Sequence, residues 1–269
     1  LLYRYTLSRW LKRNKHKLLP HRKPIGSVYL FIDEFTEYND TEIGIKAVEL
    51  LTRLGYEVKI ADHKESGRAF ISKGLIRKAA RLANFNVTTF KNIIDAQTPL
   101  VGIEPSGILS FRDEYPDLVD PELRPEAKLL AQNALMFDEF FEKEIKAGKI
   151  SRDLFTMEHR KIKLHGHCHQ KSLASIEPTK VMLSLPENFQ VEEIKSGCCG
   201  MAGSFGYETE HYELSMQIGE LVLFPEVRKA STEVIIAAPG TSCRHQIKDG
   251  TGRTAYHPIE IMYQALLKK

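Results

Sequence analysis

The first 167 residues of this 269-residue chain contain no cysteine, and all four cysteines follow them, at Cys168, Cys198, Cys199 and Cys243. Without a secretory leader, clustered cysteines in an enzyme-sized chain favour metal or redox chemistry over disulfides. The adjacent pair is also a poor disulfide, because the small ring that it would close strains the backbone. Two neighbouring thiolates can, however, bind one metal cluster if the turn exposes both.

The sequence also lacks a large excess of charge of one sign and long apolar runs. The formal net charge is only +3, which argues against nucleic acid as a partner. No apolar run reaches the roughly 18 residues that a membrane span needs, and no charged-then-apolar leader precedes a small-residue cleavage site. We therefore expect a globular, cytoplasmic protein.

The opening segment, residues 1–25, does not begin with Met and is rich in basic residues, with Leu, Tyr and Trp at helical spacing. Pro20 and Pro24 would end such a helix. We expect a connector helix from a missing upstream domain, so that the chain is part of a longer polypeptide. The alternative is a peripheral association of this segment with a membrane surface.

Strand and helix patterns alternate over residues 26–150. Short apolar runs rich in β-branched and aromatic residues predict strands at 27–33, 56–62 and 99–105. Helical spacing covers 41–55, 72–87 and most of 120–150, and Asp40 or Thr41 can cap the first of these helices, which ends at Gly55. Such alternation predicts a mostly parallel sheet with flanking helices.

Residues 151–269 repeat this plan. Strands are predicted at 161–167, 189–194 and 233–239, and helices at 211–224 and 258–269. When the two halves are aligned, the segment 65–67 falls on 198–200, so Glu65 and Ser66 stand where Cys198 and Cys199 stand. We therefore expect an α/β fold of two duplicated βαβ-type units, related by a pseudo-twofold axis.

The thiols should converge in space. Cys168, the 198–199 pair and Cys243 each follow a predicted strand, and the carboxyl ends of parallel strands meet at one edge of the sheet. Glycines after Cys199 let the backbone approach a cluster and direct N–H groups at sulfur. Buried cysteines packed as small apolar side chains are the alternative. That alternative leaves their shared placement at strand ends unexplained.

Three segments carry a family resemblance: "HGHCHQKSL" (165–173), "SGCCGMAGSFGYE" (196–208) and "PGTSCRHQI" (239–247). They resemble the CCG, or cysteine-rich, domain of heterodisulfide reductase and of the iron–sulfur subunits of glycolate oxidase and anaerobic glycerol-3-phosphate dehydrogenase. The resemblance is strongest to the C-terminal region of large FAD-linked oxidases, which fuse a flavin domain, a ferredoxin-like segment and this domain. It covers about residues 26–269.

The resemblance implies one metal site, held by Cys168, Cys198, Cys199 and Cys243. Members of the family carry two copies of an isolated Cys, a Cys-Cys-Gly and a late Cys-x-x-Cys. Here 26–150 is a degenerate first copy without thiols, with "ESG" (65–67) and "PSG" (105–107) in their places. The second copy, 151–269, lacks a fifth thiolate because Gly240 stands three residues before Cys243.

The metal itself is left open by the donor atoms. Four thiolates suit a [4Fe–4S] cluster or a tetrahedral Zn²⁺, and the adjacent pair favours the cluster, whose separate irons take neighbouring thiolates more easily. His165 and three other nearby histidines are candidate ligands, hydrogen-bond donors around the ligands, or plain strand-edge residues. The residues predicted to surround the ligands are His167, His169, Gly200, Arg244 and His245, and Arg244 would offset the negative charge of a thiolate cluster.

The function that the resemblance implies is one-electron transfer in an FAD-linked oxidoreductase of a small 2-hydroxy acid, such as lactate, glycolate or 2-hydroxyglutarate. The chain would be an enzyme only as part of that assembly, with the flavin and ferredoxin-like domains and an electron acceptor as its partners. FAD is expected upstream, because no G-x-G-x-x-G follows a strand here. A structural or regulatory zinc domain and a thiol–disulfide enzyme with a reactive thiol remain the alternatives. The sequence indicates no catalytic residue.

Overall fold

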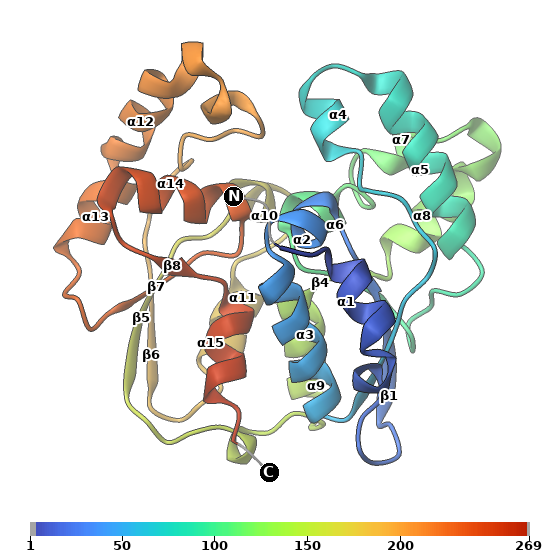
Figure 1. Cartoon of the computed structure of the whole chain (residues 1–269), viewed down its shortest axis with the longest axis horizontal. Helices are drawn as coiled ribbons and strands as arrows, with labels where there is room; N and C mark the ends of the chain where they lie inside the picture. The colour runs from blue at the N-terminus through green and yellow to red at the C-terminus, as the bar shows by residue number, and fades with distance from the viewer. Residues whose placement is uncertain (1–3, 268–269) are drawn as a thin grey trace. The chain divides into compact units, whose positions relative to one another are not determined.

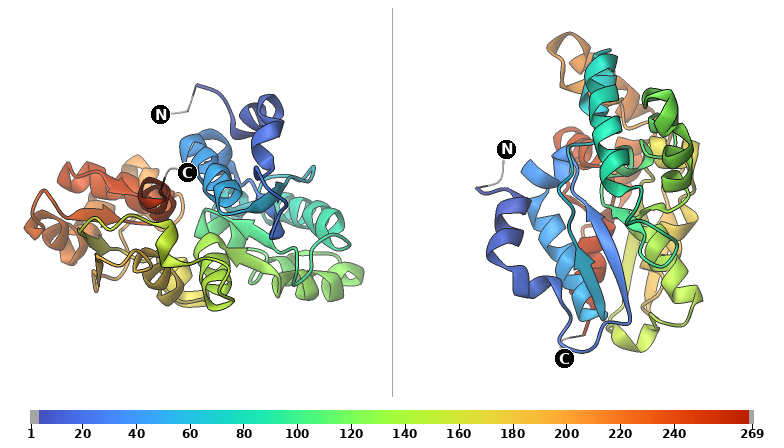
Figure 2. Two further views of the ribbon diagram at one scale, coloured as in Figure 1. Left: turned by 90° about the horizontal axis from the view of Figure 1, so that it is seen from below. Right: turned by 90° about the vertical axis from the view of Figure 1, so that its right-hand side faces the viewer.

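The structure is a computed structural model that describes residues 4–267, and the chain divides into two compact units, Leu1–Lys149 and Ile150–Lys269. Each unit has a four-stranded sheet whose strands pair in parallel (Figure 1). Helices cover both faces of each sheet (Figure 2). The predicted α/β class with parallel sheets and flanking helices is therefore confirmed.

The first unit has the sheet order β2-β1-β3-β4. Its strands are β1 (Gly26–Phe31), β2 (Tyr56–Lys59), β3 (Leu100–Gly102) and β4 (Ala134–Met136). Its helices are α1 (Leu7–Arg13), η1 (Lys15–Leu18), α2 (Glu34–Tyr38), α3 (Thr41–Arg53), α4 (Arg68–Ser72), α5 (Ile76–Phe90), α6 (Pro105–Leu109), α7 (Tyr115–Leu118), η2 (Pro121–Leu123), α8 (Arg124–Ala131) and α9 (Phe137–Lys146). Strand β4 was not predicted, because its three residues lie between two segments of helical periodicity.

Helix α3 shows why these segments fold as they do. Its apolar positions recur at helical spacing and are buried against the sheet, and the chain leaves the helix at Gly55, whose φ of +102° few side chains tolerate. The predicted cap is wrong in detail. The Asp40 side chain makes no capping bond, and the Thr41 hydroxyl donates instead to the Glu37 carbonyl at 3.0 Å.

The second unit has the sheet order β6-β5-β7-β8. Its strands are β5 (Arg160–Leu164), β6 (Phe189–Glu193), β7 (Ile235–Ala237) and β8 (Ala255–Tyr256). Its helices are η3 (Arg152–Leu154), α10 (Cys168–Leu173), α11 (Glu177–Leu183), η4 (Phe205–Tyr207), η5 (Thr209–His211), α12 (Tyr212–Leu221), α13 (Leu223–Lys229), α14 (Thr241–Thr251) and α15 (Pro258–Ala265).

The single helix predicted over 211–224 is in fact two helices, α12 and α13, which meet at Val222. Pro225 explains the break, because a proline inside a helix lacks the N–H for the residue four positions earlier and its ring collides with that carbonyl. The residue four positions before Pro225 is Leu221, the last residue of α12.

The two sheets match in order and in one special backbone position. In both, the second strand of the unit lies at one edge, the first strand lies beside it, and the third and fourth follow. Gly67 and Gly200, which the sequence alignment pairs, both have positive φ, at +78° and +103°. This supports the predicted duplication, whereas the twofold relation between the units stays a prediction.

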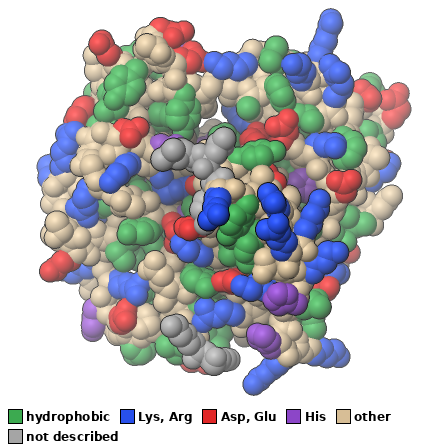
Figure 3. Space-filling model, viewed as in Figure 1, with side chains coloured by type: hydrophobic (Ala, Val, Ile, Leu, Met, Phe, Trp, Pro, Cys, Tyr) green, Lys and Arg blue, Asp and Glu red, His purple; other side chains and the backbone are tan. Residues whose placement is uncertain are grey.

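The N-terminal segment packs on the first unit. Leu7 and Leu11 of α1 are buried, and the side chain of Leu7 lies against Gly44 of α3. Lys and Arg side chains gather over α1 on the face shown in Figure 3. Residues 1–3 of the predicted connector lie outside the described residues, and its link to an upstream domain stays a prediction. Among the described helices, none is both long and apolar enough to cross a bilayer.

Candidate metal centre

The candidate site lies at the carboxyl ends of β5 and β7, two neighbouring central strands of the second sheet. The connection after β5 leads to β6 on one side, and β7 lies on the other side. Open parallel sheets bind ligands at such a switch in direction, because the loops after the two strands separate there. His165 comes directly after β5, and Cys243 lies in the first turn of α14, which follows β7.

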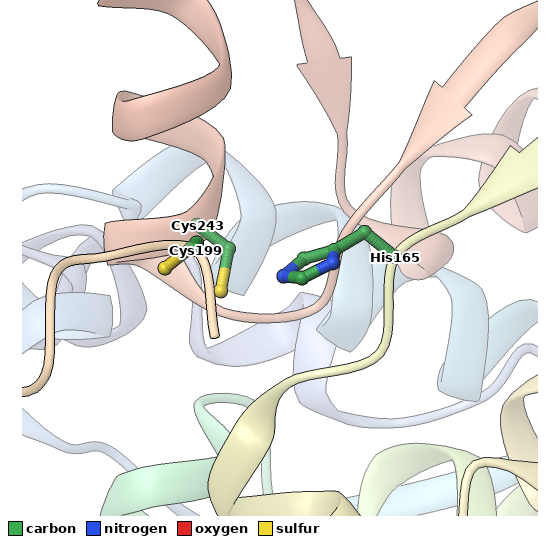
Figure 4. A group of neighbouring side chains, drawn as sticks. All are labelled: His165, Cys199 and Cys243. Carbon is green, nitrogen blue, oxygen red and sulfur yellow. The ribbon is translucent and has the colours of Figure 1, made fainter. Parts of the chain in front are cut away.

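His165, Cys199 and Cys243 point toward one another (Figure 4), and one donor atom from each lies within 4.8 Å of the other two. The three side chains are almost completely enclosed, with exposed fractions of 0%, 3% and 1%. Two sulfurs and an imidazole nitrogen thus meet in a site closed to bulk water. These are the atom types that zinc and iron prefer in sulfur-rich sites.

The other two thiols continue this group toward the surface. Cys198 interacts by its thiol with both Cys168 and Cys199, and Cys199 in turn with Cys243. The four sulfurs therefore form one contiguous chain, although the residues are up to 75 positions apart in sequence (243 − 168). Cys198 is half-buried and Cys168 is exposed, so the site is closed at the Cys243 end and open at the Cys168 end.

From Cys168 to Cys243, contacts between neighbouring sulfurs alternately raise and lower the thiol pKa. Hydrogen bonds from Cys168 and Cys199 lower the pKa of Cys198. A hydrogen bond from Cys199, followed by the charge and the side-chain hydrogen bond of His165, lowers the pKa of Cys243 against the effect of its burial. The pKa values of Cys168 and Cys199, the donors in these bonds, are raised. Two of the four sulfurs are thus stabilised as thiolates, the form that binds metals.

The loop after Cys199 directs backbone N–H groups at sulfur, as predicted from its glycines. The Gly200 N–H donates to the Cys198 sulfur at 3.3 Å, and the N–H of Ala202 points at the same sulfur. Positive φ at Gly200 (+103°) and Ala202 (+40°) turns successive N–H groups to one side. Such a concave run of N–H groups is suited to anions, here the thiolate.

Gly200 also has no room for a side chain. A Cβ at this position would lie 2.1 Å from the Ser215 carbonyl oxygen of α12. Gln246 of α14 fixes that same residue, since its amide donates to the Ser215 carbonyl at 3.1 Å. The tight turn after the cysteine pair is therefore held against two helices.

The remaining residues predicted to surround the ligands lie in different places. His167 is buried beside Gly240, and a Cβ added to Gly240 would lie 2.3 Å from the His167 imidazole. The ring of His169 stacks on that of His167, with 6.4 Å between the ring centroids. His245 lies farther out and its Nδ1 is 2.8 Å from the Tyr207 hydroxyl. Neither His169 nor His245 belongs to the three-residue donor group.

Arg244 is buried next to Cys243, and its guanidinium donates to the carbonyls of Ala238 and Pro239 at 3.1 and 2.6 Å. These contacts hold the turn between β7 and α14, and hence the backbone of Cys243. Lys171 does the same for the loop before the cysteine pair, since its ammonium donates to the Ser196 carbonyl at 2.7 Å. Both residues bring positive charge to the neighbourhood of the sulfurs.

In the first unit, the loops at the same edge of the sheet are held together by hydrogen bonds between polar groups. Glu34 accepts bonds from the N–H and the hydroxyl of Ser66, both at 2.9 Å. The Tyr115 hydroxyl donates to the Ser66 carbonyl at 2.9 Å and accepts from the Asn86 amide at 2.9 Å. Ser66, which aligns with Cys199 of the second unit, is thus held by hydrogen bonds to polar groups of the first unit.

His165 is the residue of the donor group that the sequence singles out least. The sequence pattern makes it one of several candidate histidines, outside the predicted ligand set, and gives more weight to His167 and His169 as neighbours of the ligands. The structure places His165 in the donor group. A signal for this was its position directly after a central strand, since a side chain there projects into the switch point.

Comparison with known proteins gives a consistent group of relatives. The chain is 30% identical over 241 residues to a D-2-hydroxyglutarate dehydrogenase of Pseudomonas putida, a match that covers 88% of this chain and 22% of that protein. It is 25% identical over 263 residues to a subunit of the anaerobic glycerol-3-phosphate dehydrogenase of Escherichia coli, covering 97% of this chain and 64% of that subunit. Two of its relatives are thus dehydrogenases or dehydrogenase subunits.

A third relative is lactate utilization protein A of Bacillus subtilis, 29% identical over 223 residues, with 78% of this chain and 86% of that protein covered. The chain spans less than a quarter of the length of the D-2-hydroxyglutarate dehydrogenases that it matches. No family model matches it. A crystal structure of a hypothetical protein from Helicobacter pylori shares its fold, with a TM-score of 0.52 at 10% identity, over 97% of this chain and 54% of that one.

Proposed function

We propose that the chain is the iron–sulfur electron-transfer portion of an FAD-linked oxidoreductase that acts on a small 2-hydroxy acid. The observation that carries this proposal is the convergence of Cys168, Cys198, Cys199 and Cys243 into one contiguous group at the switch point of a parallel sheet. The names of the relatives support the oxidoreductase class, and the three cysteine-bearing motifs support the CCG domain.

The residues present fit a metal centre. The four sulfurs are the donors, two of them stabilised as thiolates, and His165 adds a buried imidazole among them. When bound, an iron–sulfur cluster supplies one-electron transfer. The protein's part is to hold the sulfurs, to direct N–H groups at them, and to exclude water at the Cys199–Cys243 side, all of which tune a reduction potential.

The greater length of the relatives supports a proposal for the partners. Two D-2-hydroxyglutarate dehydrogenases among the relatives, those of Pantoea ananatis and Escherichia coli, extend far beyond the matched region. We place the flavin and ferredoxin-like domains in such an extension, upstream of residue 1, with FAD bound there. Substrate oxidation would occur on the flavin, and electrons would reach this centre one at a time.

A zinc site is the second candidate, and a specific observation favours it. His165, Cys199 and Cys243 offer donor atoms within 4.8 Å of one another, and two ligands on one ion lie at most about 4.6 Å apart, twice a Zn–S bond of ~2.3 Å. Three cysteines and one histidine form a common structural zinc set.

Anaerobic purification followed by metal analysis and EPR tests the proposal. We expect a brown protein whose reduced form gives a cluster EPR signal, and the signal should be lost in the Cys199→Ser variant. A colourless protein with one Zn²⁺ per chain would reject the cluster and support the zinc site. A metal-free protein with one rapidly alkylated thiol would support thiol–disulfide chemistry instead.

A further inference from the structure

We propose that His165 binds the metal centre directly through Nε2, so that the site is a mixed sulfur and nitrogen site rather than an all-thiolate one. This inference rests on the proposed function, because it concerns the same centre. It adds to the four cysteines that the family resemblance implies, and it selects one of the four histidines that the sequence left open as candidate ligands.

The first observation is a buried nitrogen whose neighbour is sulfur. The His165 side chain is fully buried, Nε2 has no oxygen or nitrogen partner among the described residues, and the imidazole interacts with the Cys243 sulfur. Leaving a polar atom unsatisfied in a protein interior is unfavourable, so nearly all such atoms have partners. A metal ion would satisfy this nitrogen without a proton.

The second observation concerns the tautomer. Nδ1 of His165 lies 2.7 Å from the Ser196 hydroxyl oxygen, and that oxygen lies 3.4 Å from the Ile194 carbonyl oxygen. Both contacts are hydrogen bonds in the tautomer that carries its proton on Nδ1, because the hydroxyl has a single proton to give and then donates it to the carbonyl. Nε2 is then left with a lone pair, which is the form of imidazole that binds metals.

The third observation is the direction of the ring. The His165 ring points at Cys243 and Cys199 (Figure 4), and one of its ring nitrogens lies within 4.8 Å of both sulfurs. The Nδ1–Ser196 bond holds the ring in this orientation. Metal-binding histidines typically donate their second nitrogen to such an oxygen, which sets the ring plane and raises the basicity of the ligand.

Position 240, three residues before Cys243, cannot supply a further ligand. It is a glycine, and a Cβ there would collide with the His167 ring, at 2.3 Å from Cδ2. The loop after β7 therefore contributes Cys243 alone, and the additional donor comes from His165 at the end of β5.

The test uses the full chain, reconstituted anaerobically with ferrous iron and sulfide and, separately, with zinc. Pulsed EPR of the reduced iron centre, or X-ray absorption at the zinc edge, reports whether nitrogen is bound directly. The variants are His165→Cys, which replaces nitrogen with sulfur at the same position, and His159→Ala as a control, since His159 is exposed before β5. Circular dichroism establishes that each variant is folded.

We expect directly bound nitrogen in the wild-type and His159→Ala proteins, and its loss with retained metal in His165→Cys. A metal-containing wild-type protein without bound nitrogen overturns the assignment by itself and needs no variant. A nitrogen signal that persists in His165→Cys also overturns it. A wild-type chain that takes up neither metal overturns the proposed function together with this inference, so the two failures are distinguishable.

Discussion

Among single residues, Asp33 shows how burial changes an acid in the first unit. Its carboxylate caps α2, accepting from the N–H groups of Phe35 and Thr36 at 2.9 Å and from the Thr36 hydroxyl at 2.7 Å. Burial, followed by the neighbouring charges of Glu34 and Glu104, nevertheless raises its pKa from 3.8 to about 8. Protonation of this side chain is therefore favoured in the fold relative to the unfolded chain.

This shift predicts that the first unit loses stability as pH rises. A folded pKa above the unfolded one gives stability that is fully present below about pH 4 and declines until about pH 8, by at most ~1.4 kcal/mol per pH unit. Urea unfolding followed by Trp10 fluorescence measures it, because Trp10 is the single tryptophan and lies in α1. Asp33→Asn should reduce the slope to the part that remains from Glu65, whose pKa is also raised by burial, whereas the exposed Asp117→Asn should keep the full slope. An unchanged slope in Asp33→Asn would contradict the assignment.

The four cysteines also differ as single residues, because Cys243 is enclosed and Cys168 is exposed. We expect Cys243→Ser to abolish metal binding, since its loss removes the innermost sulfur and buries a hydroxyl in its place. Cys168→Ser should bind metal and release it faster to a chelator, by about tenfold or more. Metal content and release rates after anaerobic reconstitution measure the difference. Equal loss in both variants would show that position along the sulfur chain is unimportant.

At the scale of elements, the turn after the cysteine pair depends on Gly200 in a way that sequence alone did not reveal. Its φ is +103° and a Cβ would meet the Ser215 carbonyl at 2.1 Å. Gly197, three residues earlier, has neither restriction, since a Cβ placed there would meet nothing within 4 Å and its φ is ordinary. The two glycines form a matched pair in one loop.

We expect Gly200→Ala to destabilise the second unit by about 3 kcal/mol or more, the sum of backbone strain and overpacking. Gly197→Ala should change stability by less than about 0.5 kcal/mol. Thermal unfolding and metal content of both variants provide the measurement. A neutral Gly200→Ala would mean that the turn adopts another conformation.

Elements were predictable where one physical signal dominated. Strands β1, β2 and β3 combine apolar side chains with β-branched or aromatic ones between turns, and their positions were predicted within a few residues. Strands β4 and β8 are three and two residues long, too short for any periodicity. The site was partly predictable, because each cysteine follows a strand. The orientation of His165 was not, since it depends on a bond to Ser196, 31 residues away.

For the whole molecule, the two units have the same sheet order and differ in what closes the loops at the strand ends. The second unit gathers four sulfurs there, and the first uses Glu34, Ser66, Tyr115 and Asn86 in hydrogen bonds. These polar groups of the first unit satisfy one another by hydrogen bonds, and the first 167 residues contain no thiol to bind a metal. The same fold thus has its strand-end loops held by hydrogen bonds in the first unit and lined by four sulfurs in the second.

This asymmetry predicts one centre per chain. Reconstituted protein should contain about four iron and four sulfide ions, or about one zinc if the second candidate holds. Cys198→Ser and Cys199→Ser together should reduce the content to near zero. Twice these amounts in the wild-type chain would require a second site in the first unit.

The different closures also imply that depletion of the proposed metal would affect the two units unequally. The loops of the first unit hold one another by hydrogen bonds between polar groups, whereas the thiolates favoured at Cys198 and Cys243 lack a counter-charge without metal. Protease treatment of freshly made, metal-depleted chain should therefore cut within residues 196–208 while the first unit stays intact. The supply of that metal would then set the lifetime of the protein.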